Sequence, residues 1–171
     1  MENQIGRIPD IIDVDQLPNV HYTQRRVDVL LKKAQGQTSM QIGSSLGICE
    51  TSVKNHVSCA KGEELSIPAV SVIVKMIYDG AIDISKLGID LDPSKLEQLT
   101  HRQRQIEELM SQQEMWDFGN KEIGYRLGIS ERTVKNTLGN AMHKLGTGRR
   151  IPTILYYLLT TGGLDKTQDA T

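Results

Sequence analysis

A stretch of seventeen residues occurs twice in this chain of 171 residues, and this repeat constrains the fold more than any other feature. Residues 39–55 read SMQIGSSLGICETSVKN and residues 120–136 read NKEIGYRLGISERTVKN, with nine identical positions. The match extends upstream, where YTQR at 22–25 aligns with LTHR at 99–102, and downstream, where Ile-Pro occurs in both copies. The upstream match requires a four-residue insertion in the second copy, within 113–119. The chain therefore consists of two copies of one small unit.

Each copy predicts four helices and no strand, so we expect an all-α fold of two tandem four-helix domains. In the second copy Thr100 and Ser130 are suited to cap helices, Gly128 to end one, and Pro152 to lie in the first turn of the last helix. Apolar residues between these signals recur at helical spacing. The first copy follows the same plan, and its corresponding signals are Thr23, Thr38, Gly47 and Ile67-Pro68.

The stretches outside the repeats are short and polar. They predict a flexible arm, a linker around Asp92-Pro93 and a frayed tail. The expected organisation is an arm over 1–19, a first domain over 20–80, a linker over 81–98, a second domain over 99–162 and a tail over 163–171.

The repeated spacing I-G-x-x-L-G-I-S-x-x-x-V-K predicts a helix-turn-helix, in which the second helix presents its outer face to a DNA major groove. A glycine-broken helical hairpin can equally be a packing motif, so charge must decide. Residues 120–150 hold seven basic and two acidic groups, whereas the whole chain has a net charge of -1. Such clustering is typical of a phosphate-binding face. On the helix after Ser130, Arg132, Lys135 and Asn136 fall on one side, opposite Val134.

The strings LTHRQRQI and NKEIGYRLGISERTVKN, with the later KLG, resemble the LuxR-type (GerE-like) helix-turn-helix of bacterial transcription regulators over about 99–161. The first copy resembles this domain more weakly, over about 22–80, as a degenerate version. The resemblance implies that the third helix of the second domain reads the major groove. The residues that it and the charge pattern assign to DNA in this copy are Lys121, Arg126, Arg132, Thr133, Val134, Lys135, Asn136 and Gly139.

The sequence departs from this family in its first helix and in the insertion. Glu107 stands where the family usually has Leu, and Gln103 replaces a usual Glu. The insertion carries Trp116 and Phe118, the only Trp and Phe of the chain. These two rings either dock against a partner or against the other copy, or they cover the end of the preceding helix locally.

The first copy lacks the charge of the second. Its residues 39–66 have a net charge of -1, against +5 for 120–150, and Met40 and Ser45 stand where the second copy has Lys121 and Arg126. Base contact stays possible through Lys54, Asn55 and His56. Two interpretations stay open for this copy, a second half-site reader or a pairing scaffold.

The last helix of each copy is apolar nearly all round, which is more than one core face requires. The resemblance implies a dimer interface in the fourth helix, and the residues expected there are Ile154, Leu155, Tyr157 and Leu158. The two last helices would pair within one chain as a pseudo-dimer, or between chains as a homodimer.

We expect that the protein is not an enzyme, because the sequence has no nucleophile motif, phosphate loop or paired carboxylates. We also expect that it binds neither a metal nor a cofactor. It has no membrane-spanning run or signal peptide, which predicts a cytoplasmic protein. The predicted function is sequence-specific binding of double-stranded DNA by a bacterial transcription regulator, with RNA polymerase or another LuxR-type regulator as candidate partners. The alternative is a protein-interaction module that pairs with another LuxR-type regulator through the fourth helix and blocks or redirects it.

Overall fold

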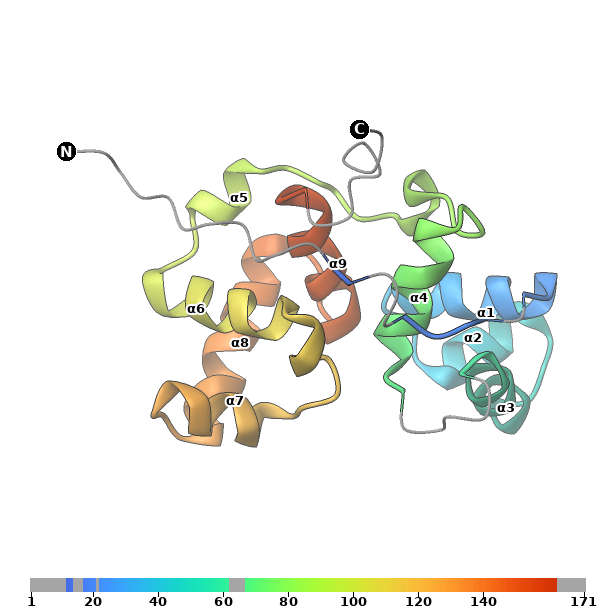
Figure 1. Ribbon diagram of the computed structural model, residues 1–171, viewed down its shortest axis with the longest axis horizontal. Coiled ribbons are helices and arrows are strands. Elements are labelled where there is room, and N and C mark those ends of the chain that lie inside the picture. Colours follow the sequence, from blue (N-terminus) through green and yellow to red (C-terminus); the bar gives the residue numbers. More distant parts are fainter. Residues whose placement is uncertain (1–11, 14–16, 21, 62–66, 163–171) are drawn as a thin grey trace.

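The computed structural model describes residues 12–13, 17–20, 22–61 and 67–162, and this part of the chain contains helices and no strand. The predicted all-α fold is thus confirmed. Figure 1 shows the helices of the first copy at one end of the molecule and those of the second copy at the other. The expected tail over 163–171 and most of the expected arm lie outside the described residues.

The first copy forms four helices at the predicted places. Thr23 caps the first, because its side chain accepts a hydrogen bond from the Arg26 backbone N–H, and Thr38 caps the second through a reciprocal pair with Gln41. The four helices are α1 (Gln24–Ala34), α2 (Ser39–Leu46), α3 (Glu50–Ala60) and α4 (Ala69–Tyr78).

The second copy repeats this plan with a longer third helix. Thr100 and Ser130 cap its first and third helices, as predicted. The insertion adds a short 3-10 helix, η3 (Gln113–Met115). The four helices of this copy are α6 (His101–Ser111), α7 (Asn120–Leu127), α8 (Glu131–Leu145) and α9 (Arg150–Thr160).

Two glycines in each copy make the helix-turn-helix possible. Gly47 and Gly128 end α2 and α7 with φ of 66° and 64°, a left-handed conformation that glycine adopts without strain. A Cβ at Gly43 or at Gly124 would come within 2.6 Å of the carbonyl oxygen of Ile48 or Ile129, respectively. The two helices of each motif can therefore cross only where no side chain intervenes.

The stretch between the copies is packed and partly helical. It contains η2 (Ile84–Leu87) and α5 (Ser94–Glu97), and the Leu87 side chain is buried. The Gln35 side chain donates a hydrogen bond to the Lys86 carbonyl (2.8 Å), and the Tyr156 hydroxyl donates one to the Asp92 carbonyl. Residues 81–98, expected as a linker, are thus held against both copies.

One apolar core joins the two copies. It includes Leu30 of α1, Ile73 and Met76 of α4, and Ile154 and Leu155 of α9, all buried. In Figure 1 α4 and α9 lie between the other helices of the two copies. Two residues of the expected arm, Ile12 and Leu17, and Val20 just after it are also buried against this core. Burial of this kind stabilises a fold by roughly 25 cal/mol for each Å² of apolar surface removed from water.

Candidate nucleic-acid interface

Helix α8 has a polar face toward solvent and an apolar face toward the core. The Ser130 hydroxyl accepts a hydrogen bond from the Thr133 backbone N–H (3.0 Å), which fixes the start of the helix. Arg132, Lys135 and Asn136 are exposed on one side, as predicted. Neither Arg132 nor Lys135 forms an ion pair with another described residue, so both cations are available to an external anion.

Val134 does not share this exposed face. Its side chain is fully buried beside Leu138, because it lies on the inner side of α8. The expectation that Val134 contacts DNA is therefore corrected: this residue packs α8 onto its domain. Thr133 is exposed, and its hydroxyl lies 2.8 Å from the Ser130 hydroxyl within the helix cap.

Gly139 is exposed to solvent in the middle of α8. A Cβ at this position would meet nothing within 4 Å, so packing within the chain does not require glycine there. Glycine inside a helix costs roughly 0.5–1 kcal/mol relative to alanine. Because no contact within the chain requires glycine at this exposed position, its lack of a side chain suits the close approach of another molecule.

Helix α7 supplies one available cation and one compensated cation. Lys121 is exposed and forms no ion pair with a described residue. Arg126 instead lies 3.2 Å from Glu114 and 3.3 Å from Glu122, and its guanidinium carbon lies 5.9 Å from the centre of the Phe118 ring. The guanidinium of Arg126, a predicted DNA contact, is therefore already engaged by Glu114 and Phe118 of the insertion.

The insertion also covers the end of α6. The indole Nε1–H of buried Trp116 donates a hydrogen bond to the Ser111 carbonyl (3.0 Å), as expected for a local cover. The Phe118 ring is partly exposed and faces Arg126. Because Trp116 is buried, it is not available to dock a separate partner.

The first copy presents a different outer face. Lys54 occupies the position of Lys135 but lies 2.8 Å from Glu50 in an ion pair. Asn55 is exposed and His56 is half-buried. Met40, at the position of Lys121, has 72% of its surface exposed and carries no charge. The fold of the two motifs is thus the same, while the charges on their outer faces differ.

The residues expected to form an interface lie inside the chain. Ile154, Leu155, Tyr157 and Leu158 of α9 are all buried. The pKa of the Tyr157 hydroxyl is raised to about 12, mainly because the group is buried and to a smaller extent because the carboxylates of Glu108 and Glu107 lie nearby. Within a single chain, this surface of α9 is already covered.

Glu107, which stands where the LuxR-type family usually has Leu, is a buried acid. Neither of its carboxylate oxygens has a hydrogen-bond partner, and burial raises its pKa to about 8 although the Arg150 guanidinium acts in the opposite direction. Its counterpart in the first copy is buried Leu30. Comparing the two copies position by position could therefore have predicted that Glu107 is buried.

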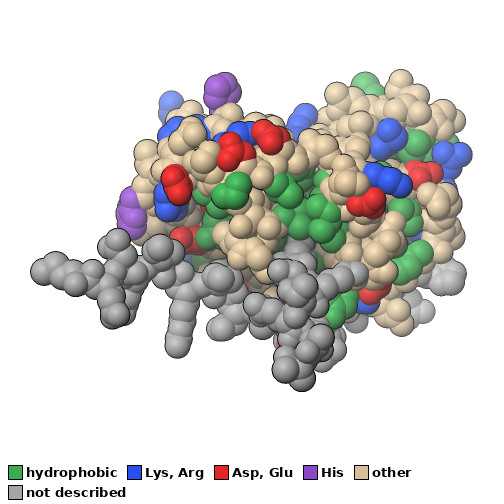
Figure 2. Space-filling view, turned by 90° about the horizontal axis from the view of Figure 1, so that it is seen from above, with side chains coloured by type: hydrophobic (Ala, Val, Ile, Leu, Met, Phe, Trp, Pro, Cys, Tyr) green, Lys and Arg blue, Asp and Glu red, His purple; other side chains and the backbone are tan. Residues whose placement is uncertain are grey.

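The face shown in Figure 2 does not have the charge of a DNA-binding surface. Basic and acidic side chains lie side by side there, with apolar side chains between them.

Among the described residues, no group of three or more His, Cys, Asp or Glu side chains could hold a metal ion. No described helix is long and apolar enough to cross a membrane.

Comparisons with known proteins match both copies. Residues 21–61 and 97–157 match the family described as bacterial regulatory proteins, luxR family. The chain is 43% identical over 67 residues to the spore germination protein GerE of Bacillus subtilis (strain 168). That match spans 39% of this chain and 84% of GerE. No solved structure matches the chain.

Proposed function

The chain belongs to the luxR family of bacterial regulatory proteins, DNA-binding regulators of transcription, and we propose that it reads DNA chiefly through α8 of the second copy. In this proposal α8 enters the major groove of double-stranded DNA. Lys135 and Arg132 then address guanine edges or phosphates, and Asn136 can pair with adenine. Lys121 at the start of α7 contacts the phosphate backbone.

The exposed face of α8 is the observation that carries this proposal. It offers Arg132 and Lys135 without ion pairs among the described residues, and beside them the bare Gly139. The matching face of α3 holds its lysine in an ion pair with Glu50. That pair is exposed to solvent and stabilises by only about 0.3–0.5 kcal/mol. The larger difference between the two faces is that Thr51 and Met40 stand in the first copy where the second has Arg132 and Lys121.

We propose that the first copy serves as a pairing scaffold. Helices α4 and α9 both contribute to the core that joins the copies, and α9 also packs against α1. In this proposal the chain acts as a pseudo-dimer, with two helix-turn-helix motifs in a single subunit. This core would hold α8 in a fixed orientation. Reading of a second half-site through Lys54, Asn55 and His56 is the alternative role, and it predicts sites with two recognisable halves.

The alternative function, a module that pairs with another LuxR-type regulator through its fourth helix, requires that helix to be exposed. That helix is buried from Pro152 to Leu158 in this chain. A homodimer through the fourth helices meets the same obstacle. Either assembly requires the shared core to open first, so we favour direct DNA binding.

Selection of bound fragments from sheared host DNA tests the proposal. We expect enriched fragments that share a sequence, and a log affinity that falls with log salt by close to one unit of slope per phosphate contact. A titrating partner protein would instead form a stable heteromer and show little affinity for DNA on its own. Failure to enrich any fragment at low salt would overturn direct recognition by this chain.

A further inference from the structure

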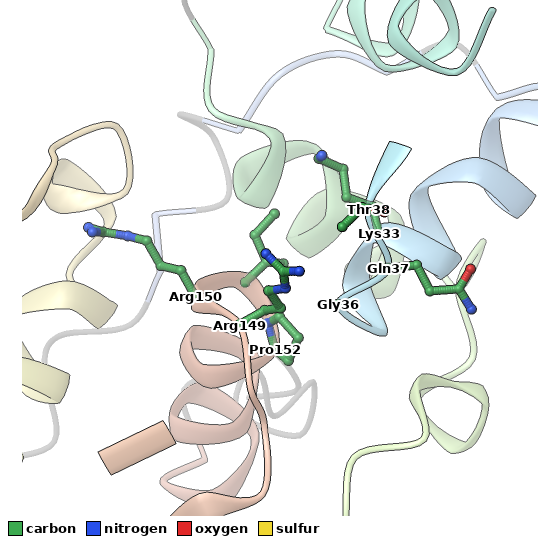
Figure 3. Close-up of a pocket in the computed structure, with 8 residues that line it drawn as sticks. Lys33, Gly36, Gln37, Thr38, Arg149, Arg150 and Pro152 are labelled. Atoms are coloured by element: carbon green, nitrogen blue, oxygen red, sulfur yellow. The ribbon is translucent and has the colours of Figure 1, made fainter. Parts of the chain in front are cut away.

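A small cavity lies at the junction of the two copies, away from the base-reading face of α8. Its volume is about 220 Å³, and Figure 3 shows the residues around it. One side is formed by the end of α1 and the turn into α2, and the other by the start of α9. The residues that matter here are Lys33, Gly36 and Thr38 from the first copy, and Arg149, Arg150 and Pro152 from the second.

The cavity has cations from both copies and no acidic residue in its lining. Neither Lys33 nor Arg149 forms an ion pair with a described residue. Burial and the positive charge of Lys61 lower the pKa of the Lys33 ammonium, so a further positive group lies near. An anion bound between Lys33 and Arg149 would relieve this repulsion.

The side chain of Arg150 is bound outside the cavity. Its guanidinium donates hydrogen bonds to the Phe118 carbonyl (2.5 Å) and the Asn120 side chain (3.4 Å). Figure 3 shows it extending away from Arg149 and Lys33. The cavity is therefore defined by one available cation from each copy, with Arg150 contributing to its wall.

Gly36 brings the two copies into close contact beside these cations. Its φ is +85°, and a Cβ there would lie 3.1 Å from the Pro152 Cγ and 3.2 Å from the Arg149 Cγ. The wall is thus tight, and a ligand held by Lys33 and Arg149 would touch both copies at once. Such a ligand would stabilise one relative placement of the two motifs.

We propose that this cavity binds a phosphate group. Arginine holds phosphate through two parallel hydrogen bonds and lysine holds it as a point charge. The volume is below the roughly 300–1,000 Å³ of pockets for drug-sized ligands, which suits one phosphate group. The group would belong either to a free phosphorylated molecule or to the DNA backbone.

Titration of the full chain with pyrophosphate at constant ionic strength tests the proposal. The readout is the backbone amide resonances of residues 36–38 and 149–151. A double variant, Lys33→Gln with Arg149→Gln, removes the two cations. A matched double variant, Lys32→Gln with Arg102→Gln, removes the same charge outside the lining. We expect saturable shifts in the wild type and the matched variant, and about tenfold weaker binding or more in the cavity variant.

DNA binding by the same proteins identifies the source of the phosphate. If the ligand is a free phosphorylated molecule, the cavity variant binds DNA as the matched variant does. If the ligand is the DNA backbone, the cavity variant loses affinity for all sequences equally, and its salt slope falls by about two.

The proposal is overturned if no saturable shift occurs at these residues and the cavity variant binds DNA as well as the matched variant. The pyrophosphate titration contains no DNA. Its result is therefore independent of whether α8 reads a sequence.

Discussion

The two helix-turn-helix motifs of this chain share a backbone and differ in what they offer to DNA. Both cross at a glycine whose Cβ would approach a carbonyl oxygen within 2.6 Å, and both turn at a left-handed glycine. On the outer faces, Lys135 has no ion pair among the described residues while Lys54 is paired with Glu50. Packing constraints can thus be retained in a repeat while the charges that bind a ligand change.

The helix starts show the same contrast. Helix α2 is capped at its N-terminus by the reciprocal hydrogen bonds of Thr38 and Gln41, and its first turn exposes Met40. Helix α7 follows Gly119, which provides no side-chain cap, and presents Lys121. Backbone N–H groups at an uncapped helix start, with a lysine beside them, favour a phosphate. This difference supports the proposal that Lys121 at the start of α7 contacts the DNA backbone.

The largest expected effect concerns Glu107, the buried acid at the position of Leu30. The folded chain keeps this carboxyl protonated up to about pH 8, whereas the unfolded chain loses the proton near the ordinary value of 4.5. The folded state therefore binds more protons between these values, and the free energy of unfolding falls as pH rises from about 4.5 to 8.

Glu107→Leu makes the second copy resemble the first and should remove this fall, raising the free energy of unfolding at pH 9 by about 4 kcal/mol. Urea unfolding at several pH values checks this prediction. Glu107→Gln, neutral at every pH, is the control for charge. An unchanged pH dependence in both variants would show that Glu107 is not buried as an acid.

The next largest effect concerns the crossing glycines, where the copies should respond alike in stability and differently in binding. Gly43→Ala and Gly124→Ala should each lower the free energy of unfolding by about 3 kcal/mol, because backbone atoms must move apart. Only Gly124→Ala should abolish DNA binding, since it displaces α8. Urea unfolding and fluorescence anisotropy measure the two effects. Equal loss of DNA affinity in both variants would mean that both copies read DNA.

A smaller effect is expected when the first copy is given the cations of the second. Met40→Lys with Ser45→Arg should tighten nonspecific DNA binding about tenfold at low salt and steepen the salt slope by up to two units. Met40→Gln with Ser45→Gln is the neutral control. A salt slope equal to that of the control would show that this copy faces away from DNA.

The smallest effect separates stability from binding at one residue. Gly139→Ala should raise the free energy of unfolding by about 0.5–1 kcal/mol, because alanine favours a helix and its Cβ meets open space. The same change should weaken specific DNA binding if a groove approaches α8 there. Ser58→Ala at the matching position of α3 is the control. Stronger or unchanged DNA binding would contradict a close approach at Gly139.

Much of the fold could be predicted from local signals in the sequence. The caps Thr23, Thr38, Thr100 and Ser130 and the turn glycines act within a few residues, and the structure has them as expected. Helical spacing also places Val134 opposite the polar side of its helix, where it is buried. The ion pairs of Arg126 and the packing of residues 81–98 depend on how helices face one another. A residue pattern gives the face of a helix, and only the assembled core shows what lies against it.

The central claim is that the second copy reads DNA and the first supports it, and one matched pair of variants tests it most directly. Lys135→Ala and Lys54→Ala remove the same side chain at equivalent positions of α8 and α3. Their affinities for a fragment selected by the wild type would be measured at one salt concentration. We predict that Lys135→Ala weakens binding about tenfold or more and that Lys54→Ala changes it less than twofold. An equal loss in both variants, or a larger loss with Lys54→Ala, would contradict the account.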